Sequence, residues 1–176
     1  MMKKKVLFII AFNDFRDEEY FVPKEILEEG GIEVKTASTQ KGIASGKLGG
    51  KTEVDLVLDE VEVDDYEAIV FVGGSGLFNY LEDPAFHKIA QEGYLNEKII
   101  GAICIAPVIL AKAGILKGKK ATVWSSPDYK ESIKELERAG AEFVAKEVVV
   151  DGNIITACGP EAAKEFGEEI LKKLRV

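Results

Sequence analysis

The sequence predicts an α/β fold with three layers, in which helices cover both faces of a mostly parallel β-sheet. Short apolar runs at residues 6–11, 68–72 and 98–103 have the continuous hydrophobicity of strands that are buried on both faces. Segments with helical spacing stand between such runs, and an alternation of strands and helices favours parallel pairing. The length of 176 residues suits one domain covering residues 1–176.

The first half of the chain continues this alternation. Residues 18–29 have helical spacing and end at two glycines, and residues 32–37 form the next strand. The polar, glycine-rich residues 38–50 are predicted to be a loop. Residues 52–63 alternate apolar and acidic positions, which indicates an exposed strand or hairpin and one plausible edge for self-association. Residues 84–95 form a helix with proline in its first turn.

The second half of the chain repeats the pattern. Cys104 follows the strand at 98–103, an apolar helix is expected after it to about residue 113, and a short strand is expected at 121–124. A charged amphipathic helix follows at 127–139. Residues 142–157 form a hairpin around an Asp-Gly turn, and a final helix ends the chain at 159–174.

Charge and composition exclude several classes of partner. The formal net charge of −8 repels phosphate backbones, so no nucleic-acid partner is expected. No segment reaches the roughly 20 apolar residues of a membrane span, and the apolar run at 6–11 is too short for a signal peptide. We therefore expect a cytoplasmic protein without a membrane partner. Abundant Glu and Lys with few Gln and Asn indicate a thermophilic source.

Two cysteines are too few for a disulfide framework, and two cysteines with a single histidine, His87, provide no metal-ligand set. No metal or other cofactor is therefore expected. His87 lies inside a predicted helix and is interpreted as an ordinary surface residue. Cys158 follows a predicted strand, where it has a structural role or resolves an oxidised partner cysteine.

Cys104 stands at the join of a buried strand and a helix. Gly101, Ala102 and Ala106 leave room for a sharp turn, and Pro107 suits the first turn of a helix. A side chain at this join lies over the helix N-terminus, where the dipole stabilises a thiolate and is expected to lower the thiol pKa. The alternative interpretation is a small core residue in front of a buried helix.

A glycine-rich turn, Gly73-Gly74-Ser75-Gly76, follows another buried strand. It does not match a dinucleotide-binding fingerprint, because Asn79 stands where a further glycine is needed. We interpret it as a tight turn whose backbone N–H groups face the cysteine, with Gly74 and Ile105 forming an oxyanion hole. A plain turn is the alternative.

The third loop, residues 13–23, contains several carboxylates. Most of them suit the first turn of a helix, where the dipole favours negative charge. One that points inward towards a thiolate would have its pKa raised by desolvation and like charge. Protonated, such a carboxyl would donate a hydrogen bond to the sulfur and later shuttle a proton. These three loops follow predicted strands, and sites of such folds lie beyond the carboxyl ends of the strands.

Together, a first-strand loop with Glu19 four residues before Pro23, Val-Gly-Gly after a strand, and Ala-Ile-Cys-x-x-Pro around Cys104 resemble the ThiJ/PfpI superfamily. It includes deglycase-like proteins and PfpI-type intracellular peptidases, and the resemblance covers essentially the whole chain. It implies a flavodoxin-like three-layer sandwich that associates as a dimer or a hexamer. It also implies that Cys104 is the reactive thiol and Glu19 its partner carboxyl, with Glu18 as the nearby alternative.

The resemblance further implies that backbone N–H groups of Gly74 and Ile105 surround a small acceptor oxygen. Two histidine positions of the superfamily are replaced. Peptidase-like members have histidine directly after the nucleophile, where Ile105 stands, and their acidic partner falls near Phe78. Deglycase-like members have histidine before a proline, where this chain has Ser126, which we keep as a candidate binding residue.

The implied function is a cysteine-dependent protein that acts on small reactive aldehydes, as glyoxalases and deglycases do, or in the oxidative stress response. Its expected partner is a small-molecule substrate or oxidant. Without imidazole, amide hydrolysis lacks an acid for the leaving amine. A PfpI-type peptidase and a non-catalytic redox sensor or scaffold are the alternatives, so whether the chain is an enzyme stays open.

Overall fold

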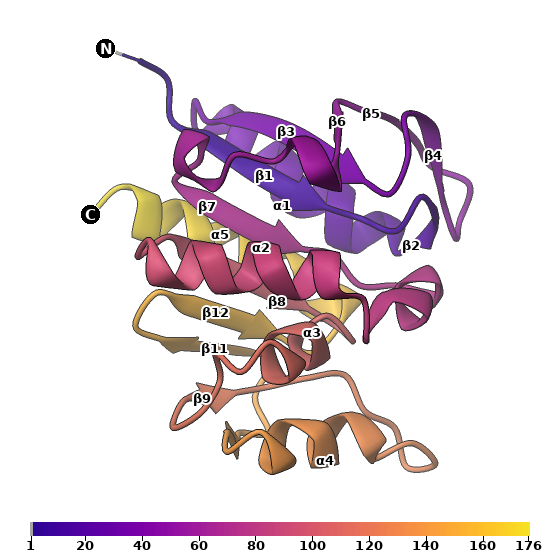
Figure 1. Cartoon of the computed structure of the whole chain (residues 1–176), viewed down its shortest axis with the longest axis vertical. Coiled ribbons are helices and arrows are strands. Elements are labelled where there is room, and N and C mark those ends of the chain that lie inside the picture. The colour runs from indigo at the N-terminus through magenta and orange to yellow at the C-terminus, as the bar shows by residue number, and fades with distance from the viewer. Residues whose placement is uncertain (1) are drawn as a thin grey trace.

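The computed structural model of the chain describes residues 2–176, and a seven-stranded sheet forms its centre (Figure 1). The strand order is β11-β12-β8-β7-β1-β3-β6, and every neighbouring pair is parallel except β11 with β12. The strands are β1 (Lys5–Ile9), β3 (Glu33–Ser38), β6 (Leu56–Val57), β7 (Ala68–Phe71), β8 (Ile99–Ile103), β11 (Val148–Asp151) and β12 (Ile154–Ala157). The mostly parallel sheet that the apolar runs predicted is therefore confirmed.

Helices cover both faces of this sheet (Figure 1). The helices α2 (Pro84–Leu95), α3 (Pro107–Lys112) and α4 (Glu131–Arg138) lie on one face, and α1 (Asp17–Glu29) and α5 (Ala163–Leu174) lie on the other. Successive side chains of a strand point to opposite faces, so β1 contributes Leu7 to one hydrophobic core and Phe8 to the other. No helix within residues 2–176 combines the length and the apolar character that crossing a membrane needs.

A small second sheet corrects the expectation of a loop at 38–50. Residues Gly42–Gly46 form β4, which pairs antiparallel with β5 (Lys51–Val54) and parallel with β2 (Asn13–Phe15). The strand prediction for 52–63 was only partly right, since β5 and β6 are short and single helical turns follow at Leu58–Glu60 and Val63–Asp65. The strand β4 was missed because its glycine and polar residues give no apolar strand pattern, although its partner β5 follows it directly in the sequence.

Three boundaries in the second half also differ from the prediction. The strand expected at 121–124 is β9 (Lys120–Ala121), which pairs with β10 (Glu142–Phe143), so residues 142–147 are not part of the hairpin. Helix α4 begins at Glu131 rather than at 127, because Ser126 and Tyr129 close a tight turn in front of it. The helix expected after Cys104 begins at Pro107, and α5 begins at Ala163 after a helical turn at Pro160–Ala162.

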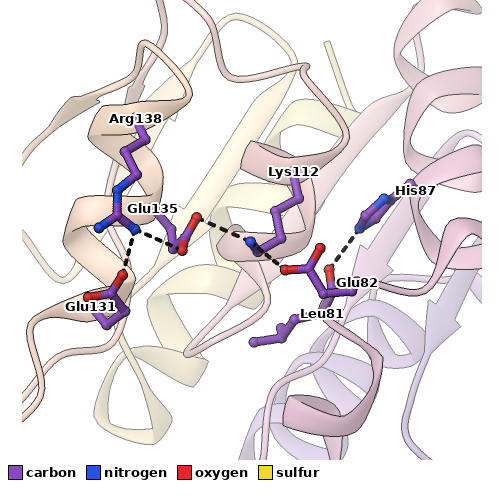
Figure 2. A network of polar contacts seen from close by, with 7 residues as sticks. All are labelled: Leu81, Glu82, His87, Lys112, Glu131, Glu135 and Arg138. Carbon is purple, nitrogen blue, oxygen red and sulfur yellow. Dashed lines mark hydrogen bonds and ion pairs between the residues drawn. The ribbon is translucent and has the colours of Figure 1, made fainter.

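An ion-pair network ties α3 to α4 (Figure 2). The ammonium of Lys112 lies 2.6 Å from Glu82 and 3.2 Å from Glu135. Arg138 in turn contacts Glu135 at 3.0 Å and Glu131 at 2.5 Å. This network fastens the helix that follows Cys104 to its neighbour and to the segment before α2.

His87, also drawn in Figure 2, is half-buried rather than fully at the surface. Its Nε2 lies 2.8 Å from the carbonyl oxygen of Leu81, to which it donates. The histidine thus closes the turn in front of α2 and has a structural role there.

Candidate active site

Cys104 occupies a strained turn between β8 and α3. Its φ of 65° lies in the left-handed region, which is uncommon for residues other than glycine. The conformation is fixed on both sides, because Cys104 N–H donates to Ala157 at 2.9 Å and its carbonyl accepts from Trp124 N–H at 2.8 Å. Such a strand–turn–helix join with an over-determined strained residue is typical of a nucleophile elbow.

The glycine turn behind β7 packs directly against this elbow. A Cβ on Gly73 would lie 2.6 Å from the Cys104 Cβ and 2.6 Å from Glu19 Oε1. Gly74 has a φ of +117°, and a Cβ there would lie 2.4 Å from the backbone nitrogen of Arg16. The same nitrogen donates to the Gly73 carbonyl at 3.0 Å. The turn therefore faces the cysteine, as the sequence predicted, and only glycine fits so close to it.

Glu19 lies in the first turn of α1 and is completely buried. Neither carboxyl oxygen has a hydrogen-bond partner of ordinary geometry within residues 2–176. Burial raises the pKa of Glu19 to about 8, against the opposing effects of the Cys104 thiol, Arg16 and the Gly73 N–H. The carboxyl is thus protonated at neutral pH, the state in which it can donate a proton.

Glu18, the alternative partner in the sequence, points elsewhere. Its carboxylate accepts from Arg16 Nε at 2.7 Å and from Arg16 Nη2 at 3.2 Å. This hydrogen bonding holds the pKa of Glu18 below its ordinary value. The helix register therefore places Glu19, and not Glu18, beside Cys104.

The pKa of the Cys104 thiol corrects one expectation. Burial and the nearby Glu19 carboxylate raise the pKa of Cys104, whereas the backbone N–H groups of Ile105 and Gly74 lower it by a smaller amount. The sequence had predicted a net lowering by the helix N-terminus. That effect is outweighed because the thiol is largely desolvated and helix α3 starts three residues later, at Pro107.

A cavity of about 240 Å³ opens in front of the sulfur. It lies at the carboxyl ends of β1, β7 and β8, as expected for such folds. Its lining comes from all three predicted loops and from three further segments: Arg16, Glu19, Lys47, Gly74, Ser75, Phe78, Cys104, Trp124 and Pro160. A larger cavity of about 520 Å³ lies at the opposite end of the sheet, around Tyr94, Lys119 and Asn153, and its lining contains no cysteine.

Ser126 is not brought to this lining. Its N–H donates to the Tyr129 carbonyl at 3.0 Å within the turn before α4. The cavity wall in this region is aromatic instead. Trp124 and Phe78 both pack against Tyr129, with ring centroids 5.5 and 6.0 Å apart. Trp124 is the only tryptophan of the chain, and its position at the end of the strand predicted at 121–124 was the available signal for it.

Arg16 and Lys47 were also missed. Arg16 stood among the carboxylates of the first loop, and Lys47 stood in the segment interpreted as a loop. Nothing in the sequence links the two residues, because they line one cavity only when the turn between β4 and β5 packs against the start of α1.

Cys158 is half-buried just beyond β12, and both cysteines are free thiols. Its sulfur donates to Glu161 at 3.4 Å, and burial together with this carboxylate raises its pKa to about 12. Cys158 is not part of the cavity lining. No group of three or more potential metal-ligating side chains gathers in the part of the chain that the structure describes.

Comparison with known proteins agrees with this architecture. The model of the DJ-1/PfpI family matches residues 4–173. An uncharacterized protein from Methanocaldococcus jannaschii is 48% identical over 99% of this chain and 84% of the relative, and the deglycase PfpI from Pyrococcus furiosus is 36% identical over 97% of this chain and 99% of the relative.

Among solved structures, a ThiJ/PfpI domain protein from Brachyspira murdochii superposes with a TM-score of 0.93 at 35% identity, covering 99% of this chain and 98% of the other. DJ-1beta from Drosophila melanogaster gives a TM-score of 0.86 at 29% identity, with coverage of 98% and 91%. The chain therefore belongs to the DJ-1/PfpI family.

Proposed function

We propose that this protein is a cysteine-dependent enzyme that acts on small reactive aldehydes. The observation that carries the proposal is the pairing of Cys104, held in a strained elbow, with the buried and unpartnered carboxyl of Glu19 at one small cavity. Relatives at 36% identity that carry the name deglycase support a reaction of this class.

The first step is addition of the thiol to the aldehyde. The Cys104 sulfur forms a bond to the carbonyl carbon, and the π electrons of the C=O bond move to the oxygen. The N–H groups of Gly74 and Ile105, which act on the sulfur and lower the pKa of Cys104, would stabilise this oxygen. The thiol proton passes through Glu19 to the oxygen, so that a neutral hemithioacetal forms and no oxidant or reductant is needed.

For this step, the Cys104 thiol and the Glu19 carboxyl must together hold one proton rather than two. Because burial raises the pKa of Glu19 to about 8, the pair holds both protons at neutral pH and loses the first one near pH 8. The addition rate should therefore increase with pH around this midpoint.

The size and chemistry of the cavity argue against a peptidase. Its lining contains no histidine, and His87 is engaged with Leu81 in front of α2. When an amide bond is cleaved, the leaving amine must accept a proton. In Cys-His enzymes the imidazole that lies beside the nucleophile donates this proton. A volume of about 240 Å³ suits a molecule of a few carbon atoms better than an extended peptide.

The test is consumption of methylglyoxal and glyoxal by the intact protein. The wild type and Cys158→Ser should consume aldehyde at the same rate, whereas Cys104→Ala and Glu19→Gln should be inactive. A protein that consumes no aldehyde although its Cys104 is alkylated by iodoacetamide would overturn the proposal in favour of a redox sensor. Hydrolysis of a fluorogenic peptide that disappears in Cys104→Ala would overturn it in favour of a peptidase.

A further inference from the structure

Two cationic side chains, Arg16 and Lys47, line the same cavity as Cys104. The proposed addition of a thiol to a neutral aldehyde uses neither of them. In a chain with a net charge of −8, cations that converge on one small cavity need a separate explanation.

Arg16 is oriented by its neighbour and keeps free donors. Glu18 holds Nε and Nη2, whereas Nη1 has no hydrogen-bond partner within residues 2–176. The hydrogen bond to Glu18 is the largest effect that raises the pKa of Arg16, and the ionised forms of Glu19 and Cys104 raise it further, so the guanidinium lies within electrostatic reach of this pair. The unoccupied edge of the guanidinium, Nη1 with the second Nη2 proton, has the fork geometry that suits a carboxylate.

Lys47 lies in the turn between β4 and β5, which is held in place by hydrogen bonds. Its backbone N–H donates to Phe15 at 2.9 Å. The buried carboxylate of Asp17, at the start of α1, accepts from the N–H groups of Leu48 at 2.8 Å and Gly50 at 2.7 Å. The lysine side chain forms no ion pair with any carboxylate that the structure describes, so its charge is available to a ligand.

Inside the cavity nothing cancels these two charges at neutral pH. Glu18 offsets part of the Arg16 charge from outside the lining, but Glu19 is protonated and Cys104 is a thiol. The buried carboxyl of Glu19 has no hydrogen-bond partner of ordinary geometry within residues 2–176, and Arg16 and Lys47 line the same cavity. A bound anion would therefore gain charge–charge attraction in a partly desolvated place.

We propose that the Cys104 cavity selects carbonyl compounds that carry a carboxylate within a few atoms of the reacting carbon, with the carboxylate bound between Arg16 and Lys47. The identity of the reacting group rests on the proposed function, whereas the anion position does not. Trp124 and Phe78 provide an apolar wall for the short carbon skeleton.

The test compares alkylation of Cys104 by iodoacetate and by iodoacetamide, which have nearly the same shape but differ in charge. Cys158→Ser serves as the background, so that Cys104 is the only thiol. The ratio of the two second-order rate constants, divided by the same ratio for free glutathione, measures preference for the anion. A change in the pKa of Cys104 alters both rate constants by the same factor and therefore cancels in this ratio.

We expect a normalised ratio above 1 that falls about tenfold in Arg16→Gln, as for loss of a hydrogen bond to a charged group. Lys47→Gln should lower it about threefold, because the lysine is exposed. Lys51→Gln is the matched control, since Lys51 lies on the same hairpin outside the cavity lining, and it should leave the ratio unchanged. A ratio at or below that of glutathione, or one that Arg16→Gln leaves intact, would overturn the anion position.

A second measurement does not depend on thiol reactivity. In Cys104→Ser, the single tryptophan at the cavity reports binding by its fluorescence. Glycolate should give a saturable change that Arg16→Gln weakens, and uncharged glycolamide should give none. Equal responses to both compounds, or no response to either, would refute the anion position. Failure to consume methylglyoxal would not affect this result, so the two proposals can fail separately.

Discussion

Burial of Glu19 should make the protein less stable as pH increases from 5 to 8. The carboxyl has an ordinary pKa of 4.5, and burial raises it to about 8 in the fold. Between these values the folded state binds the proton more tightly than the unfolded chain does, so the free energy of unfolding decreases as pH increases. Each pH unit across the window corresponds to about 1.4 kcal/mol, which gives a loss on the order of 5 kcal/mol.

Substitution by Gln removes the titrating group and should remove this loss. Glu19→Gln should therefore have nearly the stability of the wild type at pH 5 and exceed it at pH 8 by at least ~2 kcal/mol, after relaxation around the site reduces the full amount. Glu18→Gln is the matched control on the adjacent residue. Its pKa is lowered, so its stabilising effect is complete above its ordinary value of 4.5 and is lost only below it.

Guanidinium unfolding at pH 5, 6, 7 and 8, at one protein concentration and with linear extrapolation, gives the required free energies. This range stays below pH 9, the ordinary pKa of the Cys104 thiol, so ionisation of the sulfur in the unfolded chain does not interfere. If Glu19→Gln shows the same dependence on pH as the wild type and Glu18→Gln, the inference that Glu19 is protonated in the fold is wrong.

Three further predictions follow from contacts around the site. Gly73→Ala places a Cβ 2.6 Å from the Cys104 Cβ, so we expect a loss of stability of about 1–3 kcal/mol from overpacking and loss of Cys104 alkylation, measured by unfolding and mass spectrometry. Asp17→Asn weakens two hydrogen bonds to the turn between β4 and β5, which should cost about 1–3 kcal/mol in unfolding free energy. Lys112→Met breaks the ion pairs that join α3 to α4 and to the segment before α2, and its effect, below about 1 kcal/mol, should disappear in high salt.

Much of the fold could be read from the sequence because parallel strands leave a strong signal. Residues of β1, β7 and β8 are almost all buried, so each strand is a continuous apolar run. The strand β4 gave no such signal, since three of its five residues are glycine or serine and it forms part of a small peripheral sheet. It pairs with β5, which follows it directly in the sequence, and with β2, a distant segment whose contribution local patterns do not encode.

The positions of the proposed reacting groups could be predicted for a similar reason. Cys104 and the glycine turn follow strands directly, so their place at one edge of the sheet follows from topology. The choice between Glu18 and Glu19 needed the resemblance, and the structure then gave the helix register. The direction of the thiol pKa was predicted wrongly, because desolvation depends on packing by segments that a local motif does not include.

The elbow and the buried carboxyl both work against stability, and this is an argument for their function. Cys104 holds a φ of 65° that costs on the order of 1–3 kcal/mol, and Glu19 is buried without a hydrogen-bond partner within residues 2–176. A purely structural site would improve if either were replaced. If Glu19→Gln is more stable at pH 8 and at the same time no longer consumes aldehyde, stability and activity oppose each other at one residue, as expected of an active site. A variant that gains stability and keeps its activity would instead show that the carboxyl has no part in the chemistry.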